Sequence, residues 1–213
     1  MHAVLIGATG ATGRDLLDLL LQDDSFQRVD IFVRRDPNVH HDKLHVHVID
    51  FDRPELWEHL VKGDVLFSCL GTTLKAAGSK DAQWKVDYDY QYQFASLARA
   101  NKVNHYVLVS SGYAKPGSFT YYLRMKGRLE EAVKALGFAK LTIMKPPILF
   151  RNMDHRPGEA FGLKVVQMLN KIGIGFQKPL RTEILAQAMI KSAKSIGDGI
   201  VTLEGKEIQE YAR

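Results

Sequence analysis

The chain has 213 residues, a formal net charge of +5 and one cysteine, Cys69. This length is typical of a single α/β domain, and one cysteine excludes an internal disulfide. The lysines and arginines are scattered rather than gathered into runs, so we expect no nucleic-acid partner. The sequence shows neither a leader-like start nor an apolar run of membrane-spanning length, which predicts a cytoplasmic protein without a membrane partner.

Short apolar runs alternate with longer amphipathic segments along the chain. The apolar runs predict strands at residues 3–6, 29–33, 44–49, 64–70, 105–110, 140–145 and 199–203. The amphipathic segments predict helices at residues 11–22, 54–61, 81–101, 120–136, 159–172 and 182–195. This alternation of strand and helix favours βαβ units and hence a parallel sheet.

Several predicted strands are apolar throughout, as at Val65-Leu66-Phe67, which is typical of parallel strands buried on both faces. We therefore predict a Rossmann-like α/β fold, a doubly wound parallel sheet in one domain over residues 1–213. The stretch at about 150–190 breaks the alternation and is too short for a core of its own. We expect it to form a small C-terminal cap on the substrate side.

A glycine-rich turn follows the first predicted strand and opens the first predicted helix. Glycine permits a tight turn and lets the backbone approach a pyrophosphate closely. Free N–H groups and the dipole at the start of the next helix then attract the anion. The spacing GxxGxxG in this context therefore predicts a dinucleotide site, with a turn used only for packing as the alternative. The residues predicted to bind here are Gly7, Thr9, Gly10, Ala11, Thr12 and Gly13.

The end of the second predicted strand selects between the two nicotinamide dinucleotides. An acidic residue there would bind the ribose 2′-hydroxyl of NAD, whereas this chain has Arg34 and Arg35. A guanidinium binds a 2′-phosphate with paired hydrogen bonds, so we expect NADP(H) to be preferred over NAD(H), with Arg34 ahead of Arg35. Asp36 follows and keeps NAD open, and the alternative is that both arginines are solvated surface charges.

The third predicted strand ends at a segment suited to the adenine. Asp50 can accept a hydrogen bond from the exocyclic amine, with Phe51 beside it. The alternative is a structural role, with Asp52 capping a helix that begins near Pro54. These residues extend the predicted cofactor site along the edge of the sheet.

The fourth predicted strand ends in small residues, over which a cofactor can lie. Leu70, Gly71 and Thr72 are the cofactor-binding residues predicted there. The neighbouring Cys69 is expected to be a small buried apolar residue rather than a nucleophile.

The expected chemistry depends on three residues that follow the fifth predicted strand. Ser111 follows that strand, and Tyr122 and Lys126 lie four residues apart on the next predicted helix, whose inward face continues with Leu129 and Val133. A nearby ammonium stabilises a phenolate and lowers the pKa of a phenol from about 10. We predict that Tyr122 donates a proton, Lys126 tunes it and binds the nicotinamide ribose, and Ser111 anchors a carbonyl oxygen. The alternative is that Tyr122 is an ordinary surface tyrosine.

These residues together resemble the short-chain dehydrogenase/reductase superfamily, in particular its atypical branch and the Tat-interacting oxidoreductase family with its bacterial relatives. The likeness covers nearly the whole chain. The segments that carry it are Gly7–Gly13, Val48–Phe51, Cys69–Thr73, Ala77-Gly78, Val86-Asp87, Ser110-Ser111, Tyr122 with Lys126-Gly127, and Arg156–Glu159. The resemblance implies a Rossmann fold, NADPH binding and a Ser–Tyr–Lys site, which by position is Ser111, Tyr122 and Lys126.

The resemblance also bears on two further segments. In that family the segment after the sixth strand offers backbone groups to the nicotinamide amide, which here implicates Pro146 and Ile148. Pro147 stands where the family has glycine and removes an N–H donor. Many relatives carry Asn as a fourth site member on the long helix, and the match here is Asp87, whose carboxylate cannot donate as an amide does. A proton relay through Asp87 therefore stays open.

Two side-chain clusters and two arginines can be interpreted either structurally or functionally. Four histidines surround the third strand, where a solvated edge strand is favoured over a metal site. An aromatic series at helical spacing indicates core packing, with a dimer seam as the alternative. Arg151 or Arg156 can bind an acidic substrate group. The histidines are His40, His41, His45 and His47, and the aromatic residues are Trp84, Tyr88 and Tyr92.

These patterns predict an NADP(H)-binding oxidoreductase of the atypical short-chain type that reduces a small carbonyl substrate. The alternative is an NADPH-binding regulatory or protein-interaction module with little or no catalysis, in which a homodimer or a protein partner uses the surface. A weaker alternative keeps the cofactor bound for isomerisation or dehydration, but nucleotide-sugar substrates need more room than this chain offers.

Overall fold

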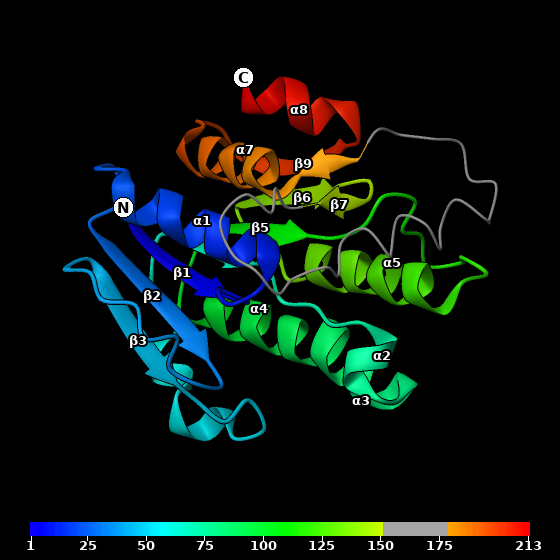
Figure 1. Ribbon diagram of the computed structural model, residues 1–213, viewed down its shortest axis with the longest axis horizontal. Coiled ribbons are helices and arrows are strands. Elements are labelled where there is room, and N and C mark those ends of the chain that lie inside the picture. Colours follow the sequence, from blue (N-terminus) through cyan, green and yellow to red (C-terminus); the bar gives the residue numbers. More distant parts are fainter. Residues whose placement is uncertain (151–178) are drawn as a thin grey trace, which may run out of the picture.

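The computed structural model describes residues 1–150 and 179–213. Within these ranges the chain forms a seven-stranded parallel sheet in the order β3-β2-β1-β4-β5-β6-β9 (Figure 1). A separate parallel pair joins β7 to β8. The strands are β1 (His2–Ile6), β2 (Arg28–Val33), β3 (Leu44–Val48), β4 (Val65–Ser68), β5 (His105–Val109), β6 (Lys140–Lys145), β7 (Leu149–Phe150), β8 (Leu180–Arg181) and β9 (Gly199–Glu204).

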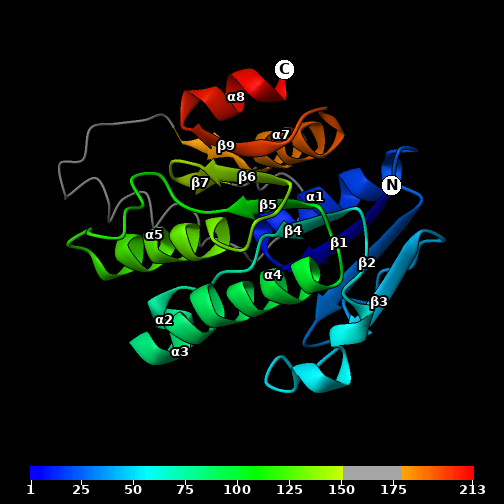
Figure 2. The same ribbon diagram turned by 180° about the vertical axis from the view of Figure 1, so that it is seen from behind.

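Two layers of helices cover the sheet, as the opposite views in Figures 1 and 2 show. On one face α1 (Ala11–Gln22) packs against α7 (Thr182–Lys194), which in turn contacts α8 (Lys206–Ala212). On the other face lie α4 (Tyr90–Ala100) and α5 (Tyr121–Lys134). None of the helices in the two described ranges is long and apolar enough to cross a bilayer.

Strand β1 shows why the strands are apolar on both faces. Ala3 and Leu5 belong to the core beneath α1 and α7, whereas Val4 and Ile6 belong to the core beneath α4 and α5. All four side chains are fully buried. Each face of the sheet therefore has its own apolar core, as a parallel sheet between two helical layers requires, and the predicted doubly wound fold is confirmed.

The helices differ from the prediction in two places. The expected helix at 54–61 is instead two 3₁₀ turns, η1 (Pro54–Leu56) and η2 (Glu58–Leu60), separated by the buried Trp57, whose indole N–H donates to the Asp50 carbonyl at 2.7 Å. The expected helix at 81–101 is α3 (Lys80–Trp84), a π turn named η3 (Lys85–Asp89) and α4 in succession, with α2 (Leu74–Ala77) before them.

Four short elements were not predicted, because β7, β8, α2 and α8 are too brief to show a hydrophobic period. The predicted helix at 159–172 and most of the predicted cap lie outside the described residues, as do Arg151 and Arg156.

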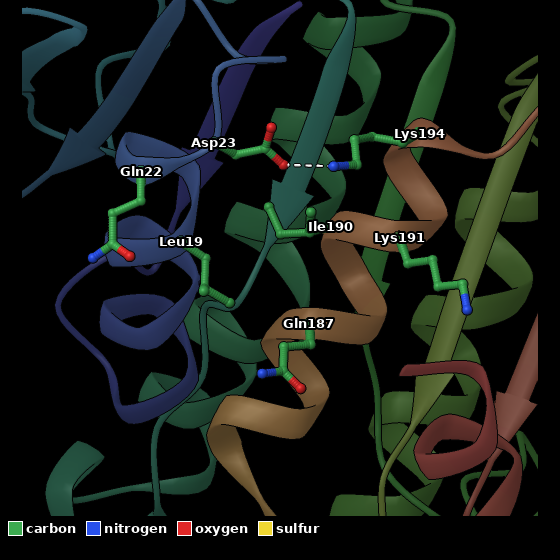
Figure 3. A pocket seen from close by; sticks show the side chains of 7 residues that line it. All are labelled: Leu19, Gln22, Asp23, Gln187, Ile190, Lys191 and Lys194. Atoms are coloured by element: carbon green, nitrogen blue, oxygen red, sulfur yellow. Dashed lines mark hydrogen bonds and ion pairs between the residues drawn. The ribbon is translucent and has the colours of Figure 1, made fainter. Parts of the chain in front are cut away.

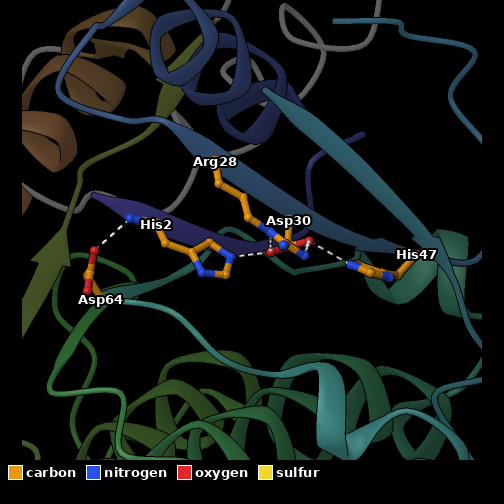
Figure 4. Close-up of polar contacts among 5 residues, drawn as sticks. All are labelled: His2, Arg28, Asp30, His47 and Asp64. Carbon is orange, nitrogen blue, oxygen red and sulfur yellow. Dashed lines mark hydrogen bonds and ion pairs between the residues drawn. The ribbon is translucent and has the colours of Figure 1, made fainter. Parts of the chain in front are cut away.

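A buried carboxylate, Asp30, lies in the middle of β2. Its Oδ1 lies 2.7 Å from His47 Nε2 and its Oδ2 accepts from Arg28 Nε at 2.9 Å, while His2 contacts the same Oδ2 (Figure 4). Burial by itself raises the pKa of Asp30, but the hydrogen bonds from His2, His47 and Arg28 outweigh it and hold that pKa below its usual range. The cluster ties β1, β2 and β3 together at one side of the sheet.

The histidines of β3 therefore divide. The strand is the sheet edge, as predicted, and His45 is exposed. His47, however, is turned inward, where its ring stacks on Phe32 with centroids 4.7 Å apart. Within the described residues no group of three histidine, cysteine or carboxylate side chains is arranged to hold a metal ion.

Replacing Asp30 with Asn tests the cluster through the pH dependence of stability. A carboxyl whose folded-state pKa lies below its unfolded value stabilises the fold above about pH 4 and loses that contribution as the pH falls. We expect the free energy of unfolding of the wild type, measured with urea from pH 6 to pH 3, to fall more steeply than that of Asp30→Asn. The exposed Asp42→Asn is the control and should keep the wild-type slope. Equal slopes for wild type and Asp30→Asn would contradict this account.

Candidate functional site

The turn between β1 and α1 requires glycine at both of its ends. Gly7 has a φ of +81°, and a Cβ there would lie 2.5 Å from the backbone nitrogen of Leu70. A Cβ on Gly13 would lie 2.7 Å from the carbonyl carbon of Gly7. The turn is therefore pressed against both the end of β4 and the first turn of α1, and side chains at these positions would separate them.

The start of α1 is suited to an anion. Its N-cap is Gly10, which has no side chain to occupy the first N–H groups, and its first turn carries no acidic residue. Thr9, Gly10 and Ala11 are exposed, whereas Thr12 is buried. Bare N–H groups and the positive end of a helix dipole bind phosphate groups, so these residues fit the diphosphate of a dinucleotide.

The end of β2 presents two guanidinium groups to solvent. Arg34 and Arg35 follow the strand directly and are both exposed. Asp36, the residue that favoured NAD, accepts a hydrogen bond from the backbone N–H of Asn38 at 2.8 Å within its own turn. One oxygen of that carboxylate is thus already engaged, while both guanidinium groups face solvent.

The segment after β3 serves the core more than the sequence suggested. Phe51 is 5% exposed and packs against Trp57, Tyr90 and Phe94, so its ring belongs to the core. Asp50 is exposed, with one oxygen accepting from the backbone N–H of Asp52 at 2.9 Å. Asp50 remains available to an adenine through its other oxygen.

The alternative in which Asp52 caps a helix near Pro54 is wrong. The residue before η1 is Arg53, which makes no side-chain capping bond. Asp52 instead accepts from Lys85 Nζ at 2.8 Å and from the Tyr90 hydroxyl at 2.8 Å. Its carboxylate therefore holds the loop after β3 against η3, which carries Lys85, and against α4, which carries Tyr90.

The loop after β4 lies between the glycine turn and η3. The N–H of Thr72 donates to Asp87 Oδ2 at 2.8 Å, and its carbonyl accepts from Gln83 Nε2 at 3.1 Å. Gly71 is exposed and Leu70 is half-buried. Burial raises the pKa of the Cys69 thiol to about 12, which fits the expectation that Cys69 is not a nucleophile.

The loop after β5 and the helix α5 hold the three predicted reactive residues. Ser111 is half-buried, and its hydroxyl donates to the Gly112 carbonyl at 3.4 Å. Tyr122 lies in the first turn of α5 and is 38% exposed, whereas Lys126, one turn later, is 2% exposed. Among the described residues no hydrogen bond joins the Tyr122 hydroxyl to Ser111 or Lys126. The structure thus places the three at one edge of the sheet without linking them directly.

Lys126 has a partner that the three-residue site does not include. Its Nζ lies 3.3 Å from Asp87 Oδ1, with both side chains almost fully buried. That oxygen lacks a well-aligned hydrogen bond, yet the short distance between opposite charges makes this an ion pair. Burial raises the pKa of Asp87, and Lys126 and the Thr72 N–H oppose that rise. Tyr121, which directly precedes Tyr122, donates its hydroxyl to the Lys80 carbonyl.

The segment after β6 offers fewer free backbone groups than the resemblance implied. The Pro146 carbonyl accepts from the Gly112 N–H at 2.7 Å, and the Ile148 carbonyl accepts from the Leu180 N–H at 2.9 Å. Pro147 has no N–H to donate. These bonds fix the segment against the Ser111 loop and β8.

Sequence reasoning missed a second buried charge pair beneath the site. Ser110 donates to Glu130 Oε1, Lys145 Nζ lies 3.4 Å from Glu130 Oε2, and Lys145 also donates to the Ala114 carbonyl at 2.9 Å. All three polar side chains are buried. The signal was present, since Glu130 lies four residues after Lys126 on the inward face of α5 and Lys145 ends an otherwise apolar strand.

Glycine also brings the Ser111 loop onto α5. A Cβ on Gly127 would lie 2.6 Å from the Cα of Lys115, so the loop and the helix touch backbone to backbone. Because Gly127 directly follows Lys126, this contact sets how far the loop lies from the buried ammonium.

Replacing Lys145 with Met tests the buried network. The change leaves the Glu130 carboxylate buried without its cation, and breaking such a pair typically costs about 3 kcal/mol or more. We expect the free energy of unfolding in urea to fall by about that amount. Lys134→Met removes an exposed pair with Glu131 and is the control, expected to change stability by less than about 0.5 kcal/mol. Similar small losses in both variants would show that the network stabilises little.

A surface hollow lies apart from this edge. It is lined by the ends of α1 and α7 and is bordered by an ion pair of 2.7 Å between Asp23 and Lys194 (Figure 3). The hydrogen bond from Lys194 lowers the pKa of Asp23 to about 2. Because α1 starts at the glycine turn and Asp23 follows its last residue, the hollow lies at the opposite end of the helix from the turn.

The aromatic series lies along α3, η3 and α4, where successive rings stack on one another. Trp84 stacks on Tyr88 with centroids 4.8 Å apart, and Tyr88 stacks on Tyr92 at 6.2 Å. Tyr92 remains 38% exposed. The expected packing role fits these contacts, and the dimer seam stays a prediction.

Comparison with known proteins identifies the relatives of the chain. Residues 7–167 match the family described as NAD(P)H-binding. The chain is 33% identical over 211 residues to Protein HTATIP2 of Rattus norvegicus, and the alignment spans 96% of this chain and 86% of that protein. It is 32% identical over 224 residues to Protein FMP52, mitochondrial, of Meyerozyma guilliermondii, and the alignment spans 100% of this chain and 96% of that protein. These relatives confirm the resemblance seen in the sequence.

Solved structures of similar fold hold a nicotinamide dinucleotide. MoeE5 in complex with UDP-glucuronic acid and NAD superposes with a TM-score of 0.76 at 16% identity, over 96% of this chain and 76% of that one. A short-chain dehydrogenase/reductase superfamily protein from Agrobacterium tumefaciens with bound NAD superposes with a TM-score of 0.73 at 14% identity, over 96% and 77% of the chains. At such identities the likeness establishes the shared fold.

The predicted cytoplasmic location is wrong. Several FMP52 relatives are named mitochondrial proteins, among them those of Meyerozyma guilliermondii, Aspergillus oryzae and Scheffersomyces stipitis. The absence of an apolar leader argues only against secretion, whereas mitochondrial targeting segments are amphipathic and rich in arginine.

Proposed function

The chain belongs to the NAD(P)H-binding family, and on that premise we propose that it is an NADPH-dependent oxidoreductase of the atypical short-chain type that reduces a small carbonyl substrate. The observation that supports this most is the buried Lys126 one helical turn from the exposed Tyr122. An ammonium held out of water near an accessible phenol is the arrangement that proton transfer to a carbonyl requires.

The cofactor is held by the edge already described. The N–H groups at the start of α1 bind the diphosphate, and Arg34 and Arg35 bind the 2′-phosphate of NADP(H). Asp50 would contact the adenine, Leu70, Gly71 and Thr72 would help to hold the cofactor at the end of β4, and Lys126 would bind the nicotinamide ribose.

Each reactive residue has one task. When bound, the reduced cofactor supplies a hydride to the carbonyl carbon. The Tyr122 hydroxyl donates its proton to the carbonyl oxygen, and the Ser111 hydroxyl donates a hydrogen bond to the same oxygen. Lys126 stabilises the phenolate that remains, and the exposure of Tyr122 lets solvent return its proton.

Replacing Tyr122 with Phe removes only the proton donor. We expect the turnover number for carbonyl reduction, followed by loss of NADPH absorbance, to fall by about 100-fold or more, since proton transfer by a positioned group typically contributes that much. The dissociation constant for NADPH should stay within a few-fold. Tyr121→Phe, the neighbouring tyrosine that bonds to Lys80, is the control and should retain turnover. Unchanged turnover in Tyr122→Phe would remove the mechanism.

Replacing Arg34 with Ala tests the cofactor preference. Loss of a guanidinium from a phosphate removes about 1.5–3 kcal/mol of binding, so the dissociation constant for NADPH should rise at least about tenfold. NADH lacks the 2′-phosphate and serves as the internal control, with an unchanged constant. Arg35→Ala should show a smaller effect of the same kind. Equal effects on NADPH and NADH would argue against a 2′-phosphate contact.

A second candidate function has one observation in its favour. Lys126 is paired with Asp87, and the Tyr122 hydroxyl has no hydrogen bond to Ser111 or Lys126 among the described residues. A protein that holds NADPH and engages a partner, with little catalysis, is compatible with that arrangement. A screen of aldehydes and ketones with purified protein separates the two, since tight NADPH binding without consumption would favour the binding module.

A further inference from the structure

Asp87 joins two parts of the cofactor edge that are distant in sequence. One carboxylate oxygen, Oδ2, accepts from the backbone N–H of Thr72 at 2.8 Å. The other, Oδ1, lies 3.3 Å from the ammonium of Lys126 on α5. Since the Gly7 turn is pressed against Leu70, an unbroken series of contacts runs from the glycine turn through the β4 loop and Asp87 to Lys126.

The backbone around Asp87 holds the carboxylate in place. Asp87 lies in the π turn η3, and its carbonyl accepts from Gln91 Nε2 at 2.8 Å. The other end of the Gln91 amide accepts from Ser68 at the end of β4, at 2.7 Å. A Cβ on Gly71 would lie 3.3 Å from Asp87 Oδ1, so the loop leaves just enough room for this group. Wide turns of this kind inside helices often occur at functional sites.

The charge of Asp87 matters because its partner is buried. The side chain of Lys126 is 3% exposed and that of Asp87 is 1% exposed, so water screens neither charge well. The oxidised nicotinamide ring carries a positive charge that the reduced ring lacks. An ammonium without its carboxylate would therefore repel the oxidised cofactor and leave the reduced one almost unaffected.

We propose that Asp87 is a positioning residue that fixes Lys126 and the Thr72 loop and neutralises Lys126, so that the site accepts the oxidised as well as the reduced dinucleotide. This inference rests on the proposed function, since it places Lys126 beside the nicotinamide half of the cofactor. A residue with a purely structural role would affect both redox forms alike. Discrimination between them is the property that only the charge controls.

Asp87→Asn tests the charge while keeping an oxygen that can accept from Thr72. We expect the dissociation constant for NADP⁺, measured by calorimetry, to rise at least about tenfold, and that for NADPH, measured by its fluorescence, to stay within about threefold. A tenfold change in the ratio corresponds to a shift of about 30 mV in the potential of the bound couple. Asp89→Asn, an exposed carboxylate in the same π turn, is the control and should leave both constants unchanged.

A double variant separates charge from damage to the fold. Lys126→Met in the Asp87→Asn background removes the unpaired ammonium, so the ratio of the two constants should return close to that of the wild type. Equal weakening of NADP⁺ and NADPH in Asp87→Asn, or a ratio that Lys126→Met does not restore, would overturn the inference and leave the proposed function standing. A wild-type protein that binds neither dinucleotide would refute both.

Discussion

The close contact between the Gly7 turn and the end of β4 is the constraint on which the cofactor edge depends. A Cβ at Gly7 would overlap the backbone at Cys69 and Leu70. The loops that follow the adjacent strands β1 and β4 can therefore lie side by side only if residue 7 has no side chain. That approach opens the start of α1 toward the edge of the sheet and aligns the Thr72 loop beside it. The predicted contacts at the start of α1 and in the Thr72 loop therefore depend on this approach.

Helix α5 plays the corresponding role on the reactive side. Gly127 lets the Ser111 loop touch the helix backbone, and Lys126 and Glu130 on the same helix carry buried charges. Lys126 reaches Asp87, and Glu130, one turn later, reaches Lys145 and Ser110. The helix therefore fixes two loops from different strands in one rigid arrangement, with Tyr122 at its accessible end.

The parts of this arrangement that could be predicted from the sequence are those with a local pattern. The glycine spacing, the apolar strands and the four-residue step from Tyr122 to Lys126 are all periodic or contiguous, and the seven strands of the main sheet lie where they were expected. The π turn at Asp87 and the reach of Lys145 to Glu130 depend on packing between distant segments, which no local pattern records. Phe51 shows the same limit, because its burial against Trp57 and Phe94 depends on loop geometry.

Two buried ion pairs on one helix call for a reason other than stability. Replacing such a pair with apolar side chains is often neutral or stabilising, because desolvation cancels much of the attraction between the charges. What an ion pair adds is direction, since each carboxylate oxygen here has a different partner and so fixes a distance between two backbones. Asp87 fixes the β4 loop relative to α5, and Glu130 fixes the β5 and β6 ends relative to the same helix. The proposed reduction needs the nicotinamide ring and the Tyr122 phenol at a fixed distance from each other, and these ion pairs fix the backbones that would hold them.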